Sequence, residues 1–172
     1  IAPGLRRTFS FEEWNWIDNR LIQDVRTEAS KKINRDLVLD IMGTDIDARM
    51  VEIAKENAQK AGVASDITFK QMRVQDLRSD KINGVIISNP PYGERLSDDA
   101  GVTKLYAEMG EVFEPLKTWS KFILTSDENF EKKFGRQADK KRKLYNGTLK
   151  VDLYQFFGER VRRQATSEKG NI

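Results

Sequence analysis

The sequence predicts one α/β domain in which strands alternate with helices and an antiparallel hairpin closes the sheet. Short apolar runs, such as the one at 85–87, alternate with stretches whose apolar residues recur at helical spacing. An Asn-Gly pair at 146–147 separates the last two strand-like runs, and this dipeptide is a strong hairpin signal. Three successive predicted strands are each followed by a polar residue, namely Asp45, Asp76 and Asn89. Since α/β sheets bind ligands at the carboxyl ends of their strands, we expect a site there.

Composition excludes several classes of function. The chain has 172 residues, no Cys and no His. Zinc sites built on imidazole or thiolate, and triads that need His, are therefore excluded, and we expect no metal. The absence of Cys fits a reducing compartment, so we expect a cytoplasmic protein; no run is long and apolar enough for a membrane helix, and nothing resembles a signal peptide. Because the chain begins Ile-Ala-Pro-Gly without Met, we expect it to be part of a longer protein.

The charge is unevenly distributed along the chain. The net charge is only +3, but residues 131–163 contain eleven Lys and Arg against four Asp and Glu, a net of +7. The rest of the chain therefore carries −4. This asymmetry indicates a polyanionic partner for the C-terminal third, although a solvated basic face would show the same composition.

The first expected element is a helix. Ser10 and Glu13 form a capping-box pattern, which predicts a helix from Phe11 to about Lys32. Its apolar residues recur at helical spacing and form one stripe, made of Trp14, Ile17, Leu21 and Val25. The position of Trp14 on this stripe favours a place in the core.

The later elements follow from the same signals. Asp47 is expected to cap the second helix, and Gly62 to end it. Other strands and helices are expected over residues 37–43, 67–72 and 85–87 (strands), 102–113 (helix), 119–125 (strand), about 127–134 (short helix), and 141–145 with 148–157 (hairpin). The catalytic or binding domain should cover residues 1–163, and residues 164–172 should form a disordered tail.

The most informative stretch is Asn89-Pro90-Pro91-Tyr92, which follows Ser88 and the strand predicted at 85–87. Two prolines remove two N–H donors, so their carbonyls cannot join a helix or a ladder. Asn89 adds an amide oxygen that accepts hydrogen bonds, and Tyr92 adds a flat ring with a polar tip. Acceptors beside a stacking surface suit a planar base that carries an exocyclic amine, although the same residues could form an ordinary rigid turn.

This motif resembles the catalytic motif of amino-methyltransferases that use S-adenosylmethionine (SAM). The longer Asn-Pro-Pro-Tyr-Gly-Glu-Arg resembles the RNA methylases that carry a THUMP domain and methylate guanine-N2 in 23S ribosomal RNA. The resemblance implies a class I, Rossmann-like sheet and a reaction without a covalent enzyme intermediate. Asn89 and the Pro90 carbonyl would accept hydrogen bonds from the base amine, and Tyr92 would stack on the base.

The same resemblance implies which residues hold the cofactor. Asp45, at the tip of the strand predicted over 37–43, would bind the ribose hydroxyls of SAM; a role in the turn is the alternative. Asp76 would accept a hydrogen bond from the adenine amine, and Asn89 would also lie against the cofactor. Taken alone, Asp76 is equally typical of a turn.

One part of the resembled fold is missing from this sequence. The fold starts with a central strand and a glycine-rich turn that holds the methionine end of SAM, and the glycines here do not cluster. We therefore expect two halves of a sheet with a gap between them. An upstream segment with the first strand, the glycine-rich loop and the THUMP domain would complete the protein, and the chain alone would bind SAM poorly and be inactive.

The basic residues of the C-terminal third are the expected RNA contacts. They are Arg136, Lys140, Lys141, Arg142 and Lys143, and Arg95 of the Asn-Pro-Pro-Tyr-Gly-Glu-Arg motif is a further expected RNA contact. The motif alone does not choose guanine over adenine or RNA over DNA, so an adenine-N6 DNA methyltransferase is the alternative enzyme. A non-catalytic RNA-binding module is the alternative for the fragment, and Arg95 could instead pair with a carboxylate.

Overall fold

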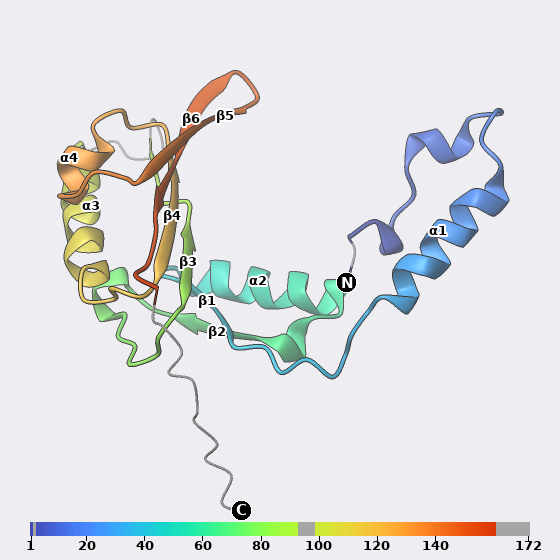
Figure 1. Cartoon of the computed structure of the whole chain (residues 1–172), viewed down its shortest axis with the longest axis horizontal. Coiled ribbons are helices and arrows are strands. Elements are labelled where there is room, and N and C mark those ends of the chain that lie inside the picture. Colours follow the sequence, from blue (N-terminus) through green and yellow to red (C-terminus); the bar gives the residue numbers. More distant parts are fainter. Residues whose placement is uncertain (2, 93–98, 161–172) are drawn as a thin grey trace, which may run out of the picture. The chain divides into compact units, whose positions relative to one another are not determined.

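The computed structural model describes residues 1, 3–92 and 99–160, which divide into two compact units, 1–73 and 74 onward (Figure 1). The order of strands and helices confirms the α/β class predicted from the sequence. Among the described residues, every helix is too short or too polar to span a membrane.

The first unit contains a two-stranded parallel sheet. Strand β1 (Ile41–Asp45) pairs with β2 (Ile67–Gln71), and helix α2 (Ala48–Ala61) connects them. Asp47 caps α2 by accepting a hydrogen bond from Arg49 N, and Gly62 ends it at a φ of 68°, as predicted. The remaining elements of this unit are η1 (Pro3–Arg6), η2 (Ser10–Glu13), α1 (Asn19–Lys31) and η3 (Ala64–Asp66).

The N-terminal helix starts later than the sequence predicted. Glu12, rather than Glu13, accepts a hydrogen bond from a backbone N–H, that of Phe9, and this closes only the short 3₁₀ turn η2. Trp14 is then extended and 50% exposed, so its expected place in the core is wrong. Helix α1 begins at Asn19, where Asp18 accepts a hydrogen bond from Arg20 N. The helix therefore begins after the cap at Asp18 and not after the apparent capping box of Ser10 and Glu13.

The first strand also differs from its expected range. Strand β1 starts at Ile41, whereas the apolar run suggested a start at Leu37. The structure assigns residues 37–39 to no strand, and Val38 is 99% exposed. An apolar run alone cannot show where strand pairing begins. In this unit only Val51 and Ala58, both on α2, are fully buried among the described residues.

The second unit contains a four-stranded sheet in the order β3-β4-β6-β5. Strands β3 (Val85–Ser88) and β4 (Ser120–Thr125) are parallel. Strands β6 (Leu149–Phe156) and β5 (Lys140–Asn146) form the predicted hairpin, and β6 is antiparallel to β4. Helices α3 (Asp99–Phe113) and α4 (Phe130–Phe134) accompany the sheet, with η4 (Val74–Asp76) against α3.

Aromatic rings dominate the core of the second unit. Phe130 contacts both Tyr106 and Tyr154, with ring centroids 4.9 and 4.7 Å apart, and Phe134 contacts Phe156 at 4.8 Å. Tyr106, Phe130, Tyr154 and Phe156 are completely buried. These contacts join α3, α4 and β6, and they make this unit a firm support for the loop that follows β3.

The described residues form two separate sheets, as the sequence predicted for a chain that lacks the first strand. Strand β3 has one partner, β4, and its apolar side chains are exposed: Val85 by 58% and Ile87 by 81%. Proteins normally protect or cover an exposed apolar edge strand such as β3.

Candidate active site

The Asn-Pro-Pro-Tyr loop leaves the sheet at the carboxyl end of β3. Ser88, the last residue of β3, pairs with Ile123 of β4, and Asn89 follows it. Asn89 is exposed and makes no hydrogen bond to any described residue, whereas Pro90 and Tyr92 are buried, with Tyr92 only 8% exposed. The amide of Asn89 is therefore available to a ligand, while its neighbours fix the loop.

A chain of hydrogen bonds below the loop holds its second proline. The Tyr106 hydroxyl donates to the Pro91 carbonyl at 3.3 Å and lies 2.9 Å from Thr125 Oγ1. Thr125 Oγ1 accepts from the Asp127 N–H at 3.1 Å. If each hydroxyl donates once, the chain runs from Asp127 through Thr125 and Tyr106 to Pro91. Burial raises the pKa of Tyr106, partly offset by the Thr125 hydrogen bond, so the hydroxyl keeps the proton it donates.

Sequence analysis missed this support. Tyr106 stands on the apolar stripe of α3, so its spacing indicates only a core residue. The one available signal was its hydroxyl, because a buried Tyr normally has a hydrogen-bond partner. Which partner it has depends on the tertiary fold.

Asp76 lies at the end of η4, in the same unit as Asn89. Its side chain is exposed and has no ion pair with a described residue. The Leu77 N–H donates to the Val74 carbonyl at 3.1 Å, and the Gln75 amide donates to Glu108 of α3, which fixes the turn. An exposed, unpaired carboxylate on a fixed turn is able to accept a hydrogen bond from a ligand.

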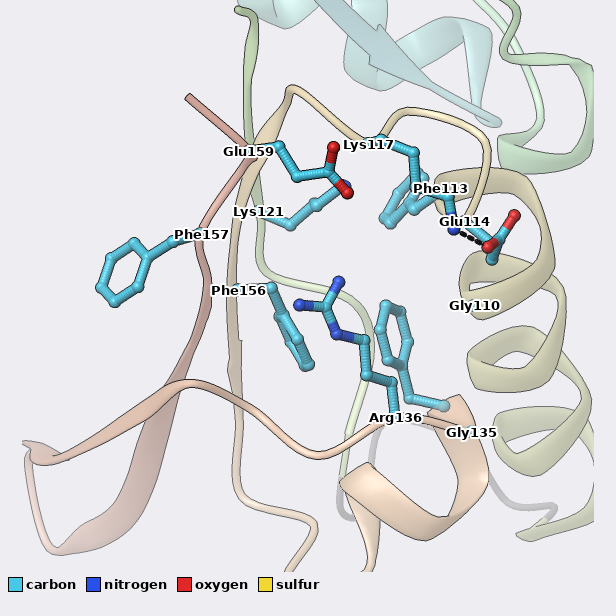
Figure 2. A pocket seen from close by; sticks show the side chains of 11 residues that line it. Gly110, Phe113, Glu114, Lys117, Lys121, Gly135, Arg136, Phe156, Phe157 and Glu159 are labelled. Carbon is cyan, nitrogen blue, oxygen red and sulfur yellow. Dashed lines mark hydrogen bonds and ion pairs between the residues drawn. The ribbon is translucent and has the colours of Figure 1, made fainter. Parts of the chain in front are cut away.

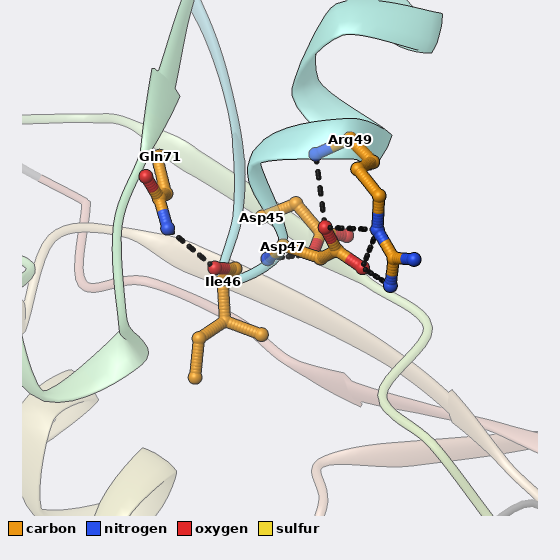
Figure 3. A network of polar contacts seen from close by, with 5 residues as sticks. All are labelled: Asp45, Ile46, Asp47, Arg49 and Gln71. Atoms are coloured by element: carbon orange, nitrogen blue, oxygen red, sulfur yellow. Dashed lines mark hydrogen bonds and ion pairs between the residues drawn. The ribbon is translucent and has the colours of Figure 1, made fainter.

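Asp45 and Asp47 form a polar network in the first unit (Figure 3). One oxygen of Asp45 accepts the Asp47 N–H at 2.8 Å, so Asp45 does stabilise the turn. The carboxylate of Asp47 binds both the backbone and the guanidinium of Arg49, and these hydrogen bonds lower the pKa of Asp47. Gln71 donates to the Ile46 carbonyl at 3.0 Å and ties the turn to β2. Asp45 is exposed and keeps its second oxygen free of described partners.

The basic residues of β5 differ in how far they are neutralised. Lys140, Arg142 and Lys143 are exposed and make no ion pair with a described residue. Lys141 pairs with Glu131 at 3.2 Å and lies 4.8 Å above the Tyr154 ring. Three of the four predicted cations are therefore free to meet an anion.

The strand register shows that the basic hairpin extends toward the end of the sheet that carries the loop. Ser88 pairs with Ile123, Ile123 with Tyr154, and Tyr154 with Lys141. From Lys141 the hairpin continues to Asn146, beyond the carboxyl ends of β3 and β4 (Figure 1).

The two other predicted RNA contacts are placed differently. Arg136 lies before β5, 3.4 Å from Asp139 and 5.6 Å from the centroid of the Phe156 ring. Phe156 pairs with Lys121, at the amino end of β4, so Arg136 is remote from the hairpin tip. Arg95 lies outside the described residues. Both remain predictions as RNA contacts.

A parallel sheet with an antiparallel sixth strand, and an Asn-Pro-Pro-Tyr loop at the carboxyl end of β3, define the class I, Rossmann-like methyltransferase fold. The chain belongs to the UPF0020 family, described as the RMKL-like methyltransferase domain, whose family model matches residues 1–155. This finding confirms the family resemblance and the fold class predicted from the sequence.

Individual relatives agree with the family assignment. YpsC of Bacillus subtilis (strain 168), named provisionally as an RNA methyltransferase, is 52% identical over 96% of this chain and 43% of its own length. The ribosomal RNA large subunit methyltransferase K/L of Shewanella amazonensis is 38% identical over 100% of this chain and 26% of its own length. The crystal structure of SMU.472, a candidate methyltransferase complexed with SAH, is 62% identical with a TM-score of 0.86, over 93% of this chain and 42% of that one. The chain thus spans less than half the length of each of these three relatives.

Proposed function

We propose that this chain is the catalytic portion of a SAM-dependent methyltransferase that acts on the exocyclic amine of a base in RNA, specifically guanine-N2 of 23S ribosomal RNA. The observation that carries the proposal is the exposed Asn89 amide at the carboxyl end of β3, which makes no hydrogen bond to a described residue, on a loop held by buried Pro90 and Tyr92. The relatives support it, since two are named for RNA methylation and one was crystallised with SAH.

The residues present fit SAM. Asp45 offers one free carboxylate oxygen to the ribose hydroxyls, and the exposed Asp76 carboxylate can accept the adenine amine. When bound, SAM supplies a methyl group already activated by its sulfonium. We propose that the rest of the full-length protein supplies the first strand, the glycine-rich loop and a THUMP domain, and that it acts in the cytoplasm. On this view the 172-residue chain alone binds SAM poorly and is inactive.

The protein's part of the chemistry is to prepare the amine. The lone pair of an exocyclic amine is delocalised into the base, so the amine is a poor nucleophile. Hydrogen bonds accepted by Asn89 Oδ1 and the Pro90 carbonyl favour the pyramidal amine and stabilise the charge that develops on it. Tyr106 holds the adjacent Pro91 carbonyl and so positions the loop. When bound, SAM would supply the methyl group to this amine, and Asn89 Oδ1 and the Pro90 carbonyl would hold the amine until its proton is lost to solvent.

The hairpin β5–β6 is the proposed RNA surface. Its cations Lys140, Arg142 and Lys143 make no ion pair with a described residue, and from the level of the last β3 residues they run toward the end of the sheet that carries the loop. The alternation of β5 turns Lys143 to the face opposite Lys140 and Arg142. Near its tip, Tyr145 is 68% exposed and pairs across the hairpin with Lys150. An exposed aromatic ring among cations suits a single-stranded segment, because bases stack on the ring while phosphates meet the cations. Tyr92, now buried, would contact the base only if the loop opens.

The test is methyl transfer by the full-length protein from labelled SAM to 23S ribosomal RNA, with digestion of the product to nucleosides. The proposal expects N2-methylguanosine, and Asn89→Ala should lower the single-turnover rate by about 100-fold or more at unchanged SAM affinity. Methylated adenine in DNA would instead support the alternative enzyme. A near-normal rate in Asn89→Ala would contradict the role of the loop.

A further inference from the structure

A cavity of about 340 Å³ lies in the second unit, among the ends of α3, α4 and β6 (Figure 2). Three cations line it, Lys117, Lys121 and Arg136, together with two carboxylates, Glu114 and Glu159. Neither the loop nor the hairpin cations Lys140, Arg142 and Lys143 line it, although Phe156 at the end of β6 does. The cavity therefore lies apart from the residues on which the proposed function rests.

Lys121 is a charged side chain inside the protein. It is 3% exposed, because the alternation of β4 turns it to the same face as Ile123 and Thr125, which are completely buried. Its ammonium group donates to the Leu116 carbonyl at 2.5 Å and has no ion pair with a described residue. Burial lowers the pKa of Lys121, and repulsion by Arg136 and Lys117 adds to this effect, against a partial offset from Glu159. A buried charge normally has a counterion, whereas this ammonium has none within ion-pair distance among the described residues.

Arg136 adds a second cation that is only weakly neutralised. Its guanidinium is 3.4 Å from Asp139 and 5.6 Å from the centroid of the Phe156 ring. Figure 2 shows this guanidinium turned into the hollow toward Lys121. Lys117, by contrast, already pairs with Glu114. Lys121 is therefore the cavity cation without an ion pair to a described residue, and Arg136 beside it has one long ion pair.

The cavity lies at the end of the sheet opposite the candidate active site. Lys121 pairs with Phe156 at the start of β4, whereas Ser88, which precedes the loop, pairs with Ile123 further along the strand. Glu159 is held at the rim, where its N–H donates to the Lys117 carbonyl at 3.0 Å. Its carboxylate is not in an ion pair with any described cation.

We propose that this cavity binds a phosphate group through Lys121 and Arg136. A phosphate monoester carries a charge of about −1.5 to −2 at pH 7, which matches two cations better than a carboxylate does. Arg and Lys are also the side chains that bind phosphate most often, Arg through a planar fork and Lys as a point charge. Inorganic phosphate, a mononucleotide and RNA all present this group, and Glu159 competes with it for Lys121.

The test uses the full-length protein and titrates it with inorganic phosphate against chloride at equal ionic strength, followed by calorimetry and thermal denaturation. Lys121→Met, which keeps the length of the side chain, and Arg136→Gln should each raise the Kd for phosphate about tenfold or more. Glu159→Gln should lower the Kd, because it removes the competing carboxylate. Lys104→Gln, at an exposed position on α3, is the matched control and should leave the Kd unchanged.

Opposite effects of the Lys121 and Glu159 changes are the expected signature. Since Arg136 is half-exposed, Arg136→Gln carries the test if Lys121→Met does not fold. Repeating the titration with GMP and with a 5′-phosphorylated RNA identifies the molecule that carries the phosphate group. That molecule should bind more tightly than inorganic phosphate, and it should lose this affinity in Lys121→Met. A wild-type protein that responds equally to phosphate and chloride, or variants with the wild-type Kd, would overturn the proposal.

Discussion

Removing the unpaired cations of the β5–β6 hairpin should flatten the salt dependence of RNA binding by a predictable amount. Lys140, Arg142 and Lys143 have no ion pair with a described residue, whereas Lys141 is held by Glu131 at 3.2 Å. Each lost contact with single-stranded RNA reduces the slope of log K against log salt by about 0.7, so alanine at the three unpaired positions should reduce it by about 2.1. Lys141→Ala should reduce the slope by less than the value of about 0.7 expected for one contact.

The assay is fluorescence anisotropy of a labelled ribosomal RNA fragment, bound to the full-length protein at about 50 to 200 mM salt. A variant with alanine at Lys32, Lys55 and Lys60 controls for net charge, because these cations belong to the first unit and form ion pairs on α1 and α2. An unchanged slope in the hairpin variant would show that the tract is only a solvated face. A Lys141→Ala effect as large as that of the triple variant would refute the reasoning from ion pairs.

Three further changes test the site and its support. Asp45→Asn keeps an acceptor for the turn but loses the charge, so calorimetry should show SAM binding weakened about tenfold and RNA binding unchanged; unchanged SAM affinity would leave Asp45 as a turn residue only. Tyr106→Phe removes both hydroxyl contacts, and we expect a lower single-turnover rate together with a loss of about 1–3 kcal/mol in the free energy of unfolding; wild-type turnover would exclude a positioning role. In Gly110→Ala the new Cβ would lie 2.1 Å from the Phe134 carbonyl oxygen, so overpacking of about 1–3 kcal/mol should outweigh the gain in helix propensity of about 1 kcal/mol. Denaturant unfolding measures this balance, with Glu111→Ala as the control, and a stabilised Gly110→Ala would show that α3 and α4 do not meet as described.

Local signals predicted the elements that local chemistry determines. Gly147, at a φ of 63°, stands at the first position of the two-residue hairpin loop, and Gly62 ends α2 in the same left-handed region. Asp47 caps its helix through a hydrogen bond to a residue two positions away. These features depend on neighbouring residues only, so the sequence is sufficient to predict them.

The features that sequence analysis missed depend on distant partners. Tyr106 supports the loop through residues 15 and 19 positions away. Lys121 follows the alternation of a strand whose buried face is defined only when α3 and α4 pack on it. One signal could have indicated the roles of both Tyr106 and Lys121. Each carries a polar group at a position where the helix or strand pattern expects an apolar side chain.

The uneven distribution of buried side chains has a consequence for amide hydrogen exchange. The first unit fully buries only Val51 and Ala58 among its described residues, whereas the ladder between β4 and β6 is flanked by completely buried Ile123, Tyr154 and Phe156. Local opening should therefore occur far more readily in β1–β2 than in β4–β6. A ligand that binds Asp45 only in the closed state would protect β1–β2 by about 2.7 kcal/mol at 100 times its Kd. Exchange in this unit would then report the occupancy of Asp45, the proposed ribose-binding residue.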